Sequence, residues 1–177
     1  MFFCSFLLVI YVFWSGTGGS PTKIPEGILK SFSGPKYGIS GIRKMMKVFY
    51  RPLVGTIVKP KLGLKTKDHA KVAYEAWLGG CDLCKDDENL ASQEFNIFEE
   101  RLARSLEKAD QAEEETGENK AYLINVTAET KETMKRAQLV EDLGGKFVML
   151  DVVTEGFGAL QSLREADFKL AIHAHRA

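Results

Sequence analysis

Short hydrophobic stretches alternate with longer amphipathic stretches along most of the chain. The short stretches predict buried strands at residues 53–58, 81–85, 121–127, 147–153 and 170–175. Between them, apolar residues recur at helical spacing and predict helices over about 66–78, 92–117, 130–143 and 159–166. A further short helix is predicted near 39–47, with one face formed by Ile42, Met45, Met46 and Phe49.

The predicted helices have recognisable ends. Thr66 and Ser92 stand where an N-cap is expected, because a hydroxyl there can accept a hydrogen bond from the first helical turn, and Thr130 is predicted to open a helix. Glycines end three of the helices, at Gly79-Gly80, Gly117 and Gly144-Gly145. The buried sides of the two central helices are predicted to carry Phe95, Phe98, Leu102, Leu106 and Ala109, and Met134, Ala137 and Leu143.

Strands that alternate with helices form parallel βαβ units, in an open doubly wound sheet or in an α/β barrel. Each predicted strand carries polar residues at or just past its C-terminal end: Lys59 and Lys61, Lys85 to Glu88, Asn125 and Thr127, Asp151 and Thr154, and His173 and His175. A barrel builds its active site on that rim, whereas a doubly wound sheet usually shows a glycine-rich first turn, which is absent here. We therefore predict the first five β/α units of a TIM-type (β/α)8 barrel, incomplete against the roughly 250 residues of a whole one.

Composition and charge exclude some classes of function. The 177 residues are 45% hydrophobic and 27% charged, which is typical of a folded chain. Lysine plus arginine and aspartate plus glutamate both total 24, so no overall field favours nucleic acid or an anionic membrane as a partner. Three cysteines provide no disulfide framework, and we expect a reducing, cytoplasmic location.

Residues 1–22 differ from the rest of the chain. Residues 1–14 are almost continuously apolar, and residues 15–20 have the composition of a flexible Gly/Ser linker. The apolar run is shorter than the roughly 20 residues that span a bilayer, and it lacks the basic start of a signal peptide. A non-homologous leader, such as one from a misplaced start, is one interpretation, and a secretion or membrane signal is the other.

The stretch Lys85-Asp86-Asp87-Glu88-Asn89 concentrates charge at the end of the second predicted strand. Residues two apart on a strand share a face, so Lys85 and Asp87 point the same way and Glu88 follows just past the end. Charged groups are costly to bury and are rarely retained for packing. Two carboxylates with converging oxygens suit Mg²⁺, although the pentapeptide alone fits a solvated acidic turn equally well.

Two other motifs have both a chemical and a structural interpretation. Lys59 and Lys61 place two ammonium groups on one face, which suits a phosphorylated substrate or a lysine base, but also a surface turn. Cys81 and Cys84 lie three residues apart and would project to opposite faces of a strand, which favours core cysteines over a metal or redox pair.

His173 and His175 share a strand face, which is metal-like geometry. Together with a lysine able to form a carbamate, the pair would also suggest a binuclear amidohydrolase barrel. That class carries its His-x-His pair on the first strand and needs further histidines. Here the pair is on the fifth strand and His69, within a predicted helix, is the only other histidine, so we disfavour that class.

Long ordered motifs resemble the large chain of ribulose-1,5-bisphosphate carboxylase/oxygenase (Rubisco). They are residues 51–64 (RPLVGTIVKPKLGL), 79–89 (GGCDLCKDDEN), 122–128 (YLINVTA) and 173–177 (HAHRA). The resemblance runs from about Pro25 to the end, and residues 34–39 and 172–176 are most similar to the archaeal-type, form III branch. It implies that residues 23–50 are a connector from the family's N-terminal domain and that residues 51–177 are the N-terminal part of the catalytic barrel.

The resemblance implies a role for each residue of the charged strand ends. Lys59 matches the base that removes the C3 proton of ribulose bisphosphate, and Lys61 matches the lysine that supports it. Lys85 matches the lysine that reacts with a non-substrate CO2, the activator, to become N6-carboxylysine. Mg²⁺ would then be held by this carbamate with Asp87 and Glu88, and would polarise the substrate oxygens.

Further roles follow from the same resemblance. His175 matches a histidine used in proton shuttling, and Arg176 matches a ligand of a substrate phosphate. His173 and Asn125 match groups beside the substrate. Two positions depart from the patterns that the resemblance implies: Leu150 stands where plant-type chains carry a histidine, which is consistent with the archaeal branch, and Glu155 stands in a loop where the family usually has a small residue.

The implied activity is carboxylation of ribulose 1,5-bisphosphate with CO2 and water to two molecules of 3-phosphoglycerate, with competing oxygenation by O2. The resemblance implies a homodimer-based oligomer for the full-length form, and it implies no nucleic-acid partner. This sequence has no counterpart of the family's N-terminal domain, of its last three barrel strands or of its mobile-loop lysine. We therefore expect this chain to be a fragment that is inactive by itself. The alternative is a Rubisco-like enolase or isomerase of methionine salvage, which the joint presence of Lys59, Lys61 and His175 disfavours.

Overall fold

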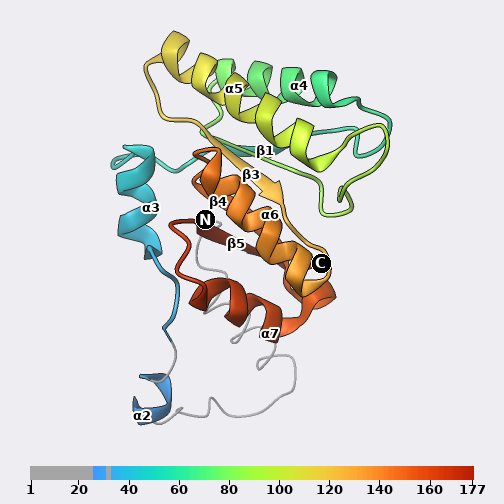
Figure 1. Cartoon of the computed structure of the whole chain (residues 1–177). Helices are drawn as coiled ribbons and strands as arrows, with labels where there is room; N and C mark the ends of the chain where they lie inside the picture. Colours follow the sequence, from blue (N-terminus) through green and yellow to red (C-terminus); the bar gives the residue numbers. More distant parts are fainter. Residues whose placement is uncertain (1–25, 31–32) are drawn as a thin grey trace, which may run out of the picture.

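The computed structural model describes residues 26–30 and 33–177 (Figure 1). The predicted leader and linker at 1–22 lie outside the described residues. The strands of the described part are β1 (Gly55–Ile57), β2 (Leu83–Lys85), β3 (Ala121–Asn125), β4 (Phe147–Asp151) and β5 (Ala171–His175). Its helices are α2 (Glu26–Leu29), α3 (Gly38–Met46), α4 (Thr66–Leu78), α5 (Phe98–Thr116), α6 (Thr130–Asp142) and α7 (Val152–Glu165).

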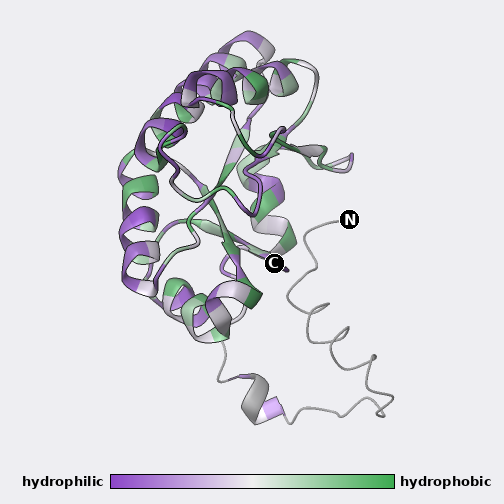
Figure 2. Cartoon of the chain, turned by 90° about the vertical axis from the view of Figure 1, so that its right-hand side faces the viewer, coloured by the Kyte–Doolittle hydropathy of each residue, from purple (hydrophilic) through white to green (hydrophobic). Residues whose placement is uncertain are grey.

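The strands form one parallel sheet in the order β1-β2-β3-β4-β5, so each strand lies beside its neighbour in sequence. Helices α4 to α7 alternate with the strands and form a curved outer layer around them (Figures 1 and 2). Five consecutive β/α units of a (β/α)8 barrel have this arrangement, and the predicted fold class is confirmed. Within the described ranges, every helix is too short or too polar to cross a bilayer.

Alternation along the strands gives the sheet two different faces. The face toward the helices is apolar and contributes to the main hydrophobic core, with Cys84, Tyr122, Ile124, Val148 and Leu150 among its residues. Trp77 of α4 and Phe98 of α5 are fully buried in the same core. Parallel strands covered in this way are buried along their whole length, as β3 and β4 are. The helix layer therefore fixes the positions of the strand ends.

Helix α3 packs near the N-terminal ends of the strands on the other face. Its buried residues Ile42 and Met46 belong to a second apolar cluster with Leu83, Ala121, Leu123, Phe147 and Ala171. We call this cluster the floor. The floor lies at the opposite end of the strands from the predicted polar residues, and the helix predicted near 39–47 is confirmed.

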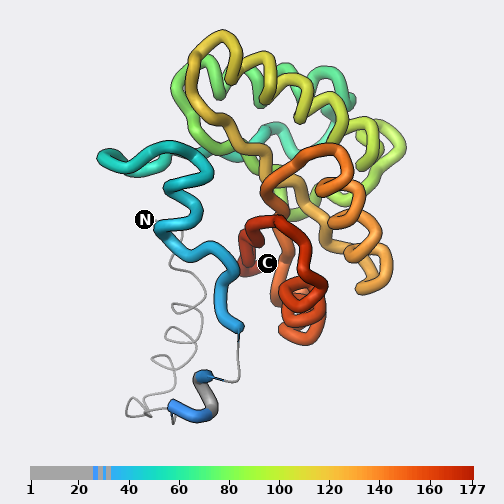
Figure 3. The backbone as a smooth tube through the Cα atoms, turned by 60° about the vertical axis from the view of Figure 1, so that its left-hand side comes forward, coloured from blue at the N-terminus to red at the C-terminus, as the bar shows by residue number. Residues whose placement is uncertain are grey.

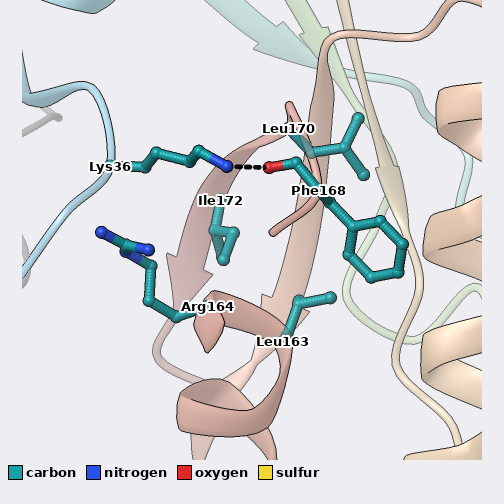
Figure 4. A pocket seen from close by; sticks show the side chains of 6 residues that line it. All are labelled: Lys36, Leu163, Arg164, Phe168, Leu170 and Ile172. Carbon is teal, nitrogen blue, oxygen red and sulfur yellow. Dashed lines mark hydrogen bonds between the residues drawn. The ribbon is translucent and has the colours of Figure 1, made fainter. Parts of the chain in front are cut away.

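The segment before α3 is fastened to the last β/α unit. Lys36 Nζ donates to the carbonyl of Phe168 at 2.7 Å (Figure 4). The same Nζ lies 3.1 Å from Asp167 Oδ1, and Arg164 Nε donates to the carbonyl of Gly34 at 2.7 Å. Figure 3 shows this blue segment beside the red C-terminal elements. The cavity between them is only about 10 Å³, the lower limit for one water molecule, so it is a docking contact of the chain rather than a ligand site.

The end of the fourth strand and the start of α7 differ from the prediction. The backbone N–H groups of Val153 and Thr154 turn away from the sheet and donate to the carbonyl of Ala177, at 2.9 and 3.2 Å. Strand β4 therefore ends at Asp151, and α7 begins at Val152 instead of near 159. The helix is interrupted at Gly156, where φ is 83° and ψ is 160°, a conformation open to glycine.

The two predicted N-caps are wrong in position, whereas the prediction that Thr130 opens a helix is confirmed. Thr66 is the first residue of α4, after the N-cap Lys65, and the cap of α6 is Glu129, whose side chain accepts from the N–H of Lys131. Helix α5 begins at Phe98, later than predicted. Ser92 still bonds to the start of that helix, because its Oγ accepts from the N–H of Phe98 at 3.1 Å across an intervening loop.

Two residues predicted on the buried faces of α5 and α6 are exposed. Phe95 lies in the loop before α5 and is 37% exposed, and Leu143 follows the end of α6 and is 47% exposed, while Val140 is buried in its place. The cysteine prediction is confirmed for Cys84, which is buried, whereas Cys81 is half-buried, and both are free thiols.

Asp82, just before β2, is a fully buried carboxylate with an arginine partner. It accepts from Arg51 Nη1 and Nη2 at 2.6 and 2.8 Å and from the N–H of Val54 at 2.8 Å. Burial alone would raise the pKa of Asp82, but the bonds from Arg51 and Val54 outweigh it and the pKa is lowered. The pair joins the segment before β1 to the start of β2.

We expect Asp82→Asn to lower the free energy of unfolding by about 1–3 kcal/mol, because the amide cannot accept all three hydrogen bonds. The folded-state pKa of Asp82 lies below the unfolded value, so its stabilisation is present above about pH 4 and is lost as the pH falls through the folded-state pKa. Thermal unfolding should show a difference in Tm between wild type and variant that shrinks below about pH 4. A difference that stays constant down to low pH would contradict this role.

Candidate active site

The C-terminal end of β2 carries Lys85, in register with Ile57 of β1 and Leu123 of β3. The Lys85 side chain is 14% exposed, and its Nζ donates to the carbonyl of Asp86 at 3.0 Å and lies 3.7 Å from Glu88 Oε2. Burial lowers the pKa of Lys85, although the neighbouring carboxylates, Glu88 first, act in the opposite direction. A lowered pKa increases the share of neutral, nucleophilic amine at a given pH.

Asp87 follows on the same side of the strand end and is fully buried. Its Oδ1 accepts from the backbone N–H and the Nδ2 of Asn89, at 2.9 and 3.0 Å, and its Oδ2 pairs with Nζ of Lys59. Burial raises the pKa of Asp87, but these hydrogen bonds outweigh it and bring the pKa to about 2. The same bond raises the pKa of Lys59. Two of the predicted residues, from different β/α units, are thus in direct contact.

The ends of β4 and β5 bring a carboxylate and two imidazoles to the same rim. Asp151 and His175 are partners in register, and Asp151 Oδ1 lies 3.2 Å from His175 Nδ1. The rings of His173 and His175 are 5.9 Å apart, so the prediction that they share a face is confirmed. Burial lowers the pKa of His173 to about 4. Burial, and after it the positive charge of Lys85, lowers the pKa of His175. Burial raises the pKa of Asp151.

Asn125, at the end of β3, links the two halves of the rim. Its Nδ2 donates to the carbonyl of Glu88 at 3.0 Å and to Asp151 Oδ2 at 3.3 Å. Lys61 and Arg176 lie further out: both side chains are exposed, and neither is hydrogen-bonded to another predicted site residue in the described part of the chain. The structure therefore brings most of the predicted residues together and leaves these two cations on the periphery.

A cleft of about 570 Å³ opens beside this rim. Its lining comes from the loops after β2, β3 and β4 and includes Glu88, Asn89, Asn125, Thr127, Asp151 and Glu155. The volume is in the range of small-molecule sites. Carboxylates at a strand end, next to a half-buried amine, are a donor set that suits a hard cation, provided that Lys85 is converted from a cation into an oxygen ligand.

A buried polar network centred on Asp86 was not predicted. Asp86 projects away from Lys85 into the helix layer, where it contacts Arg101 of α5, His69 of α4 and Tyr122 of β3, all of them buried. Burial would raise the pKa of Asp86, but Arg101 and then His69 outweigh it and lower the pKa. Two signals in the sequence pointed to this network: the alternation that turns Asp86 away from Lys85, and an arginine next to the apolar face of α5.

Glu155 also had no predicted role. Its Oε1 accepts from the backbone N–H of Ala128 and lies 3.1 Å from Oγ1 of Thr133, so it binds the start of α6 from the break in α7. A carboxylate at a helix N-terminus is favoured by the helix dipole. Glu155 thus ties the loop after β4 to the loop after β3 across the cleft.

Comparisons with known proteins agree with the geometry. A profile of the "Ribulose bisphosphate carboxylase large chain, catalytic domain" family matches residues 38–177. The chain belongs to the Rubisco large-chain family. A curated Rubisco family member from Methanocaldococcus jannaschii, "Ribulose bisphosphate carboxylase", is 60% identical over 155 residues, which cover 88% of this chain and 36% of that protein.

Two solved archaeal Rubisco structures have the same fold. An octameric Rubisco from Pyrococcus horikoshii OT3 matches with a TM-score of 0.85 and 49% identity, covering 88% of this chain and 37% of that chain. A dimeric archaeal Rubisco from Hyperthermus butylicus matches with a TM-score of 0.84 and 49% identity, covering 87% and 36%. These relatives confirm the archaeal-type resemblance. The chain spans a little over a third of the length of the Rubisco chains that it matches.

Proposed function

We propose that this chain provides the activation and enolisation part of a ribulose-1,5-bisphosphate carboxylase active site. The observation that carries the proposal is the half-buried amine of Lys85, whose pKa is lowered by burial, beside the carboxylates of Asp87 and Glu88 at a strand end. Membership in the Rubisco family supports it.

Lys85 would react with CO2 as the neutral amine. The nitrogen lone pair forms a bond to the carbon of CO2, and the nitrogen releases one proton, which leaves a carbamate anion on Nζ. This step replaces a cation by an oxygen ligand next to the two carboxylates. The residues that would hold Mg²⁺ are the Lys85 carbamate, Asp87 and Glu88, and the bound ion would supply Lewis-acid stabilisation of negative charge on the substrate.

Lys59 would act as the base that takes the C3 proton of ribulose bisphosphate. An amine accepts a proton only in its neutral form, so Lys59 has to separate from Asp87 before it acts. Lys61 would support Lys59, His175 would carry protons, and His173 and Asn125 would contact the substrate. Arg176, exposed past the end of β5, would bind a phosphate through its planar guanidinium.

The partners proposed for the whole protein are ribulose 1,5-bisphosphate, CO2 and competing O2. We also propose a homodimer-based oligomer, supported by the octameric and dimeric relatives, and a cytoplasmic location, supported by the free thiols of Cys81 and Cys84.

Carboxylation can be tested in a chimera of the M. jannaschii relative. In this chimera, the matched part of this chain replaces the corresponding 155 residues of the relative. The chimera should incorporate labelled CO2 into 3-phosphoglycerate after preincubation with bicarbonate and Mg²⁺. A chimera that assembles like its parent but has no turnover, while the parent is active, would refute the proposal. The isolated chain should form a ¹³C-carbamate on Lys85, detected by NMR, with no need for turnover.

A further inference from the structure

The carboxylate of Asp86 has every acceptor position occupied. Oδ1 accepts from the hydroxyl of Tyr122 and lies 3.1 Å from Nε2 of His69, and Oδ2 accepts from Nε of Arg101 at 3.1 Å and from the backbone N–H of Asn125 at 3.0 Å. Asp86 and Arg101 are 0% exposed, and His69 is 1% exposed. One side chain therefore joins β2 to α4, α5 and β3, in a region without solvent.

The same network fixes the chain that follows Glu88. Arg101 Nη2 donates to the carbonyl of Ala91 at 2.7 Å, and Arg101 Nη1 donates to the carbonyl of Asn96 at 2.9 Å. Asn96 Nδ2 lies 3.4 Å from Nδ1 of His69, which is consistent with Nε2 of that ring carrying the proton toward Asp86. The loop between β2 and α5 is thus bound to the guanidinium that pairs with Asp86.

A third connection reaches Glu88 itself. Asn125 donates its backbone N–H to Asp86 and its side-chain Nδ2 to the carbonyl of Glu88. Asp86 lies between Lys85 and Asp87 in the sequence. The network therefore restrains Asp86, the backbone of Glu88 and the loop that leads to α5. A shift of Asp86 would therefore displace both of its chain neighbours, Lys85 and Asp87, from their observed positions.

We propose that Asp86 and its partners Arg101, Tyr122 and His69 form a positioning network that sets the relative placement of Lys85, Asp87 and Glu88. The inference rests on the proposed function of those three residues. None of these four residues is part of the lining of the cleft beside the rim. Partners of this kind typically change metal affinity by about 10- to 100-fold when they are replaced.

A matched control lies at the opposite end of β2. Asp82 is also fully buried and also pairs with an arginine, Arg51, but it lies at the start of the strand, away from Lys85. Asp82→Asn and Asp86→Asn both replace a buried, arginine-bound carboxylate by an amide of equal size. If both groups only stabilise the fold, the two variants should behave alike at the strand end.

The test compares wild type, Asp86→Asn, Tyr122→Phe and Asp82→Asn in the full chain. The Mg²⁺ concentration that gives half of the maximal Lys85 ¹³C-carbamate signal should rise by about 10- to 100-fold in Asp86→Asn. It should rise by up to about tenfold in Tyr122→Phe, which loses a single donor and keeps its ring packing. It should not change in Asp82→Asn, measured below the Tm of each variant. If Asp86→Asn does not fold, the comparison of Tyr122→Phe with Asp82→Asn decides whether the network positions the strand end.

Amide hydrogen exchange at Asn89 provides a second readout that does not depend on carbamate chemistry. That N–H is bonded to Asp87 Oδ1, so it reports where Asp87 lies. Exchange at Asn89 should be faster in Asp86→Asn and Tyr122→Phe, and unchanged in Asp82→Asn. A wild-type chain without a carbamate signal would refute the proposed function, and the exchange comparison would still decide this inference. Equal effects of the strand-start and strand-end variants on both readouts would overturn it.

Discussion

Replacing Lys85 with alanine is expected to abolish activation by CO2 and Mg²⁺. Alanine has no amine to form a carbamate, so Asp87 and Glu88 remain as an incomplete set of oxygen ligands. In the chimera, turnover should fall to the level of a blank without enzyme, and in the isolated chain the ¹³C-carbamate signal should disappear. Lys85→Arg should fail in the same way, because a guanidinium stays protonated and does not react with CO2.

The control for this experiment is Lys71→Ala, a lysine with a 69% exposed side chain on α4. That variant should keep both the carbamate signal and the turnover. Normal Mg²⁺-dependent carboxylation by Lys85→Ala would remove Lys85 from the mechanism. A carbamate signal that persists in Lys85→Ala would show that another amine had been observed.

Replacing Lys59 is expected to separate activation from catalysis. Lys59→Ala should still form the Lys85 carbamate, because Lys59 contacts Asp87 and not the Lys85 amine. Carboxylation by the chimera should fall by about 10²- to 10⁴-fold, the usual effect of removing a general base. Exchange of the C3 proton of ribulose bisphosphate with solvent, measured in deuterated water, should fall in parallel.

Lys59→Arg distinguishes the base from the ion pair with Asp87. Arginine retains the positive charge beside Asp87 but does not accept a proton at neutral pH. We expect Lys59→Arg to lose proton exchange as fully as Lys59→Ala does. Proton exchange at the wild-type rate in the arginine variant would show that Lys59 serves only as a charge partner of Asp87.

The order of strands and the chemistry of their ends could be predicted because both depend on local patterns. Alternation placed His173 and His175 on one face, and the observed ring distance agrees. The hydrophobic runs located the five strands of the described residues and the C-terminal ends of β2 and β5, but they placed the ends of β3 and β4 two residues too late. The fourth strand ends early because its next N–H groups bond to the carbonyl of Ala177, far along the chain.

Contacts between distant residues account for what could not be predicted. Alternation along the strand predicts that Asp86 points toward the helices. It does not predict that Arg101 and three other hydrogen-bond donors surround the carboxylate there. The sequence marks Glu155 as unusual but does not show that the break at Gly156 brings its carboxylate to the start of α6. Pairings of this kind depend on tertiary geometry, which hydrophobic periodicity does not encode.

The floor under the strands has a consequence for the order of folding. The segment leading into α3 reaches its partner Phe168 across 132 residues of sequence. At a synthesis rate of about 5–20 residues per second, those residues take roughly 7–26 s to emerge from the ribosome. Helices form in about a microsecond, but the nine residues of α3 are too few for a stable isolated helix, so α3 becomes stable only after the later floor residues exist. During translation its apolar side, Ile42 and Met46, emerges well before Phe147 and Ala171, the later members of the floor.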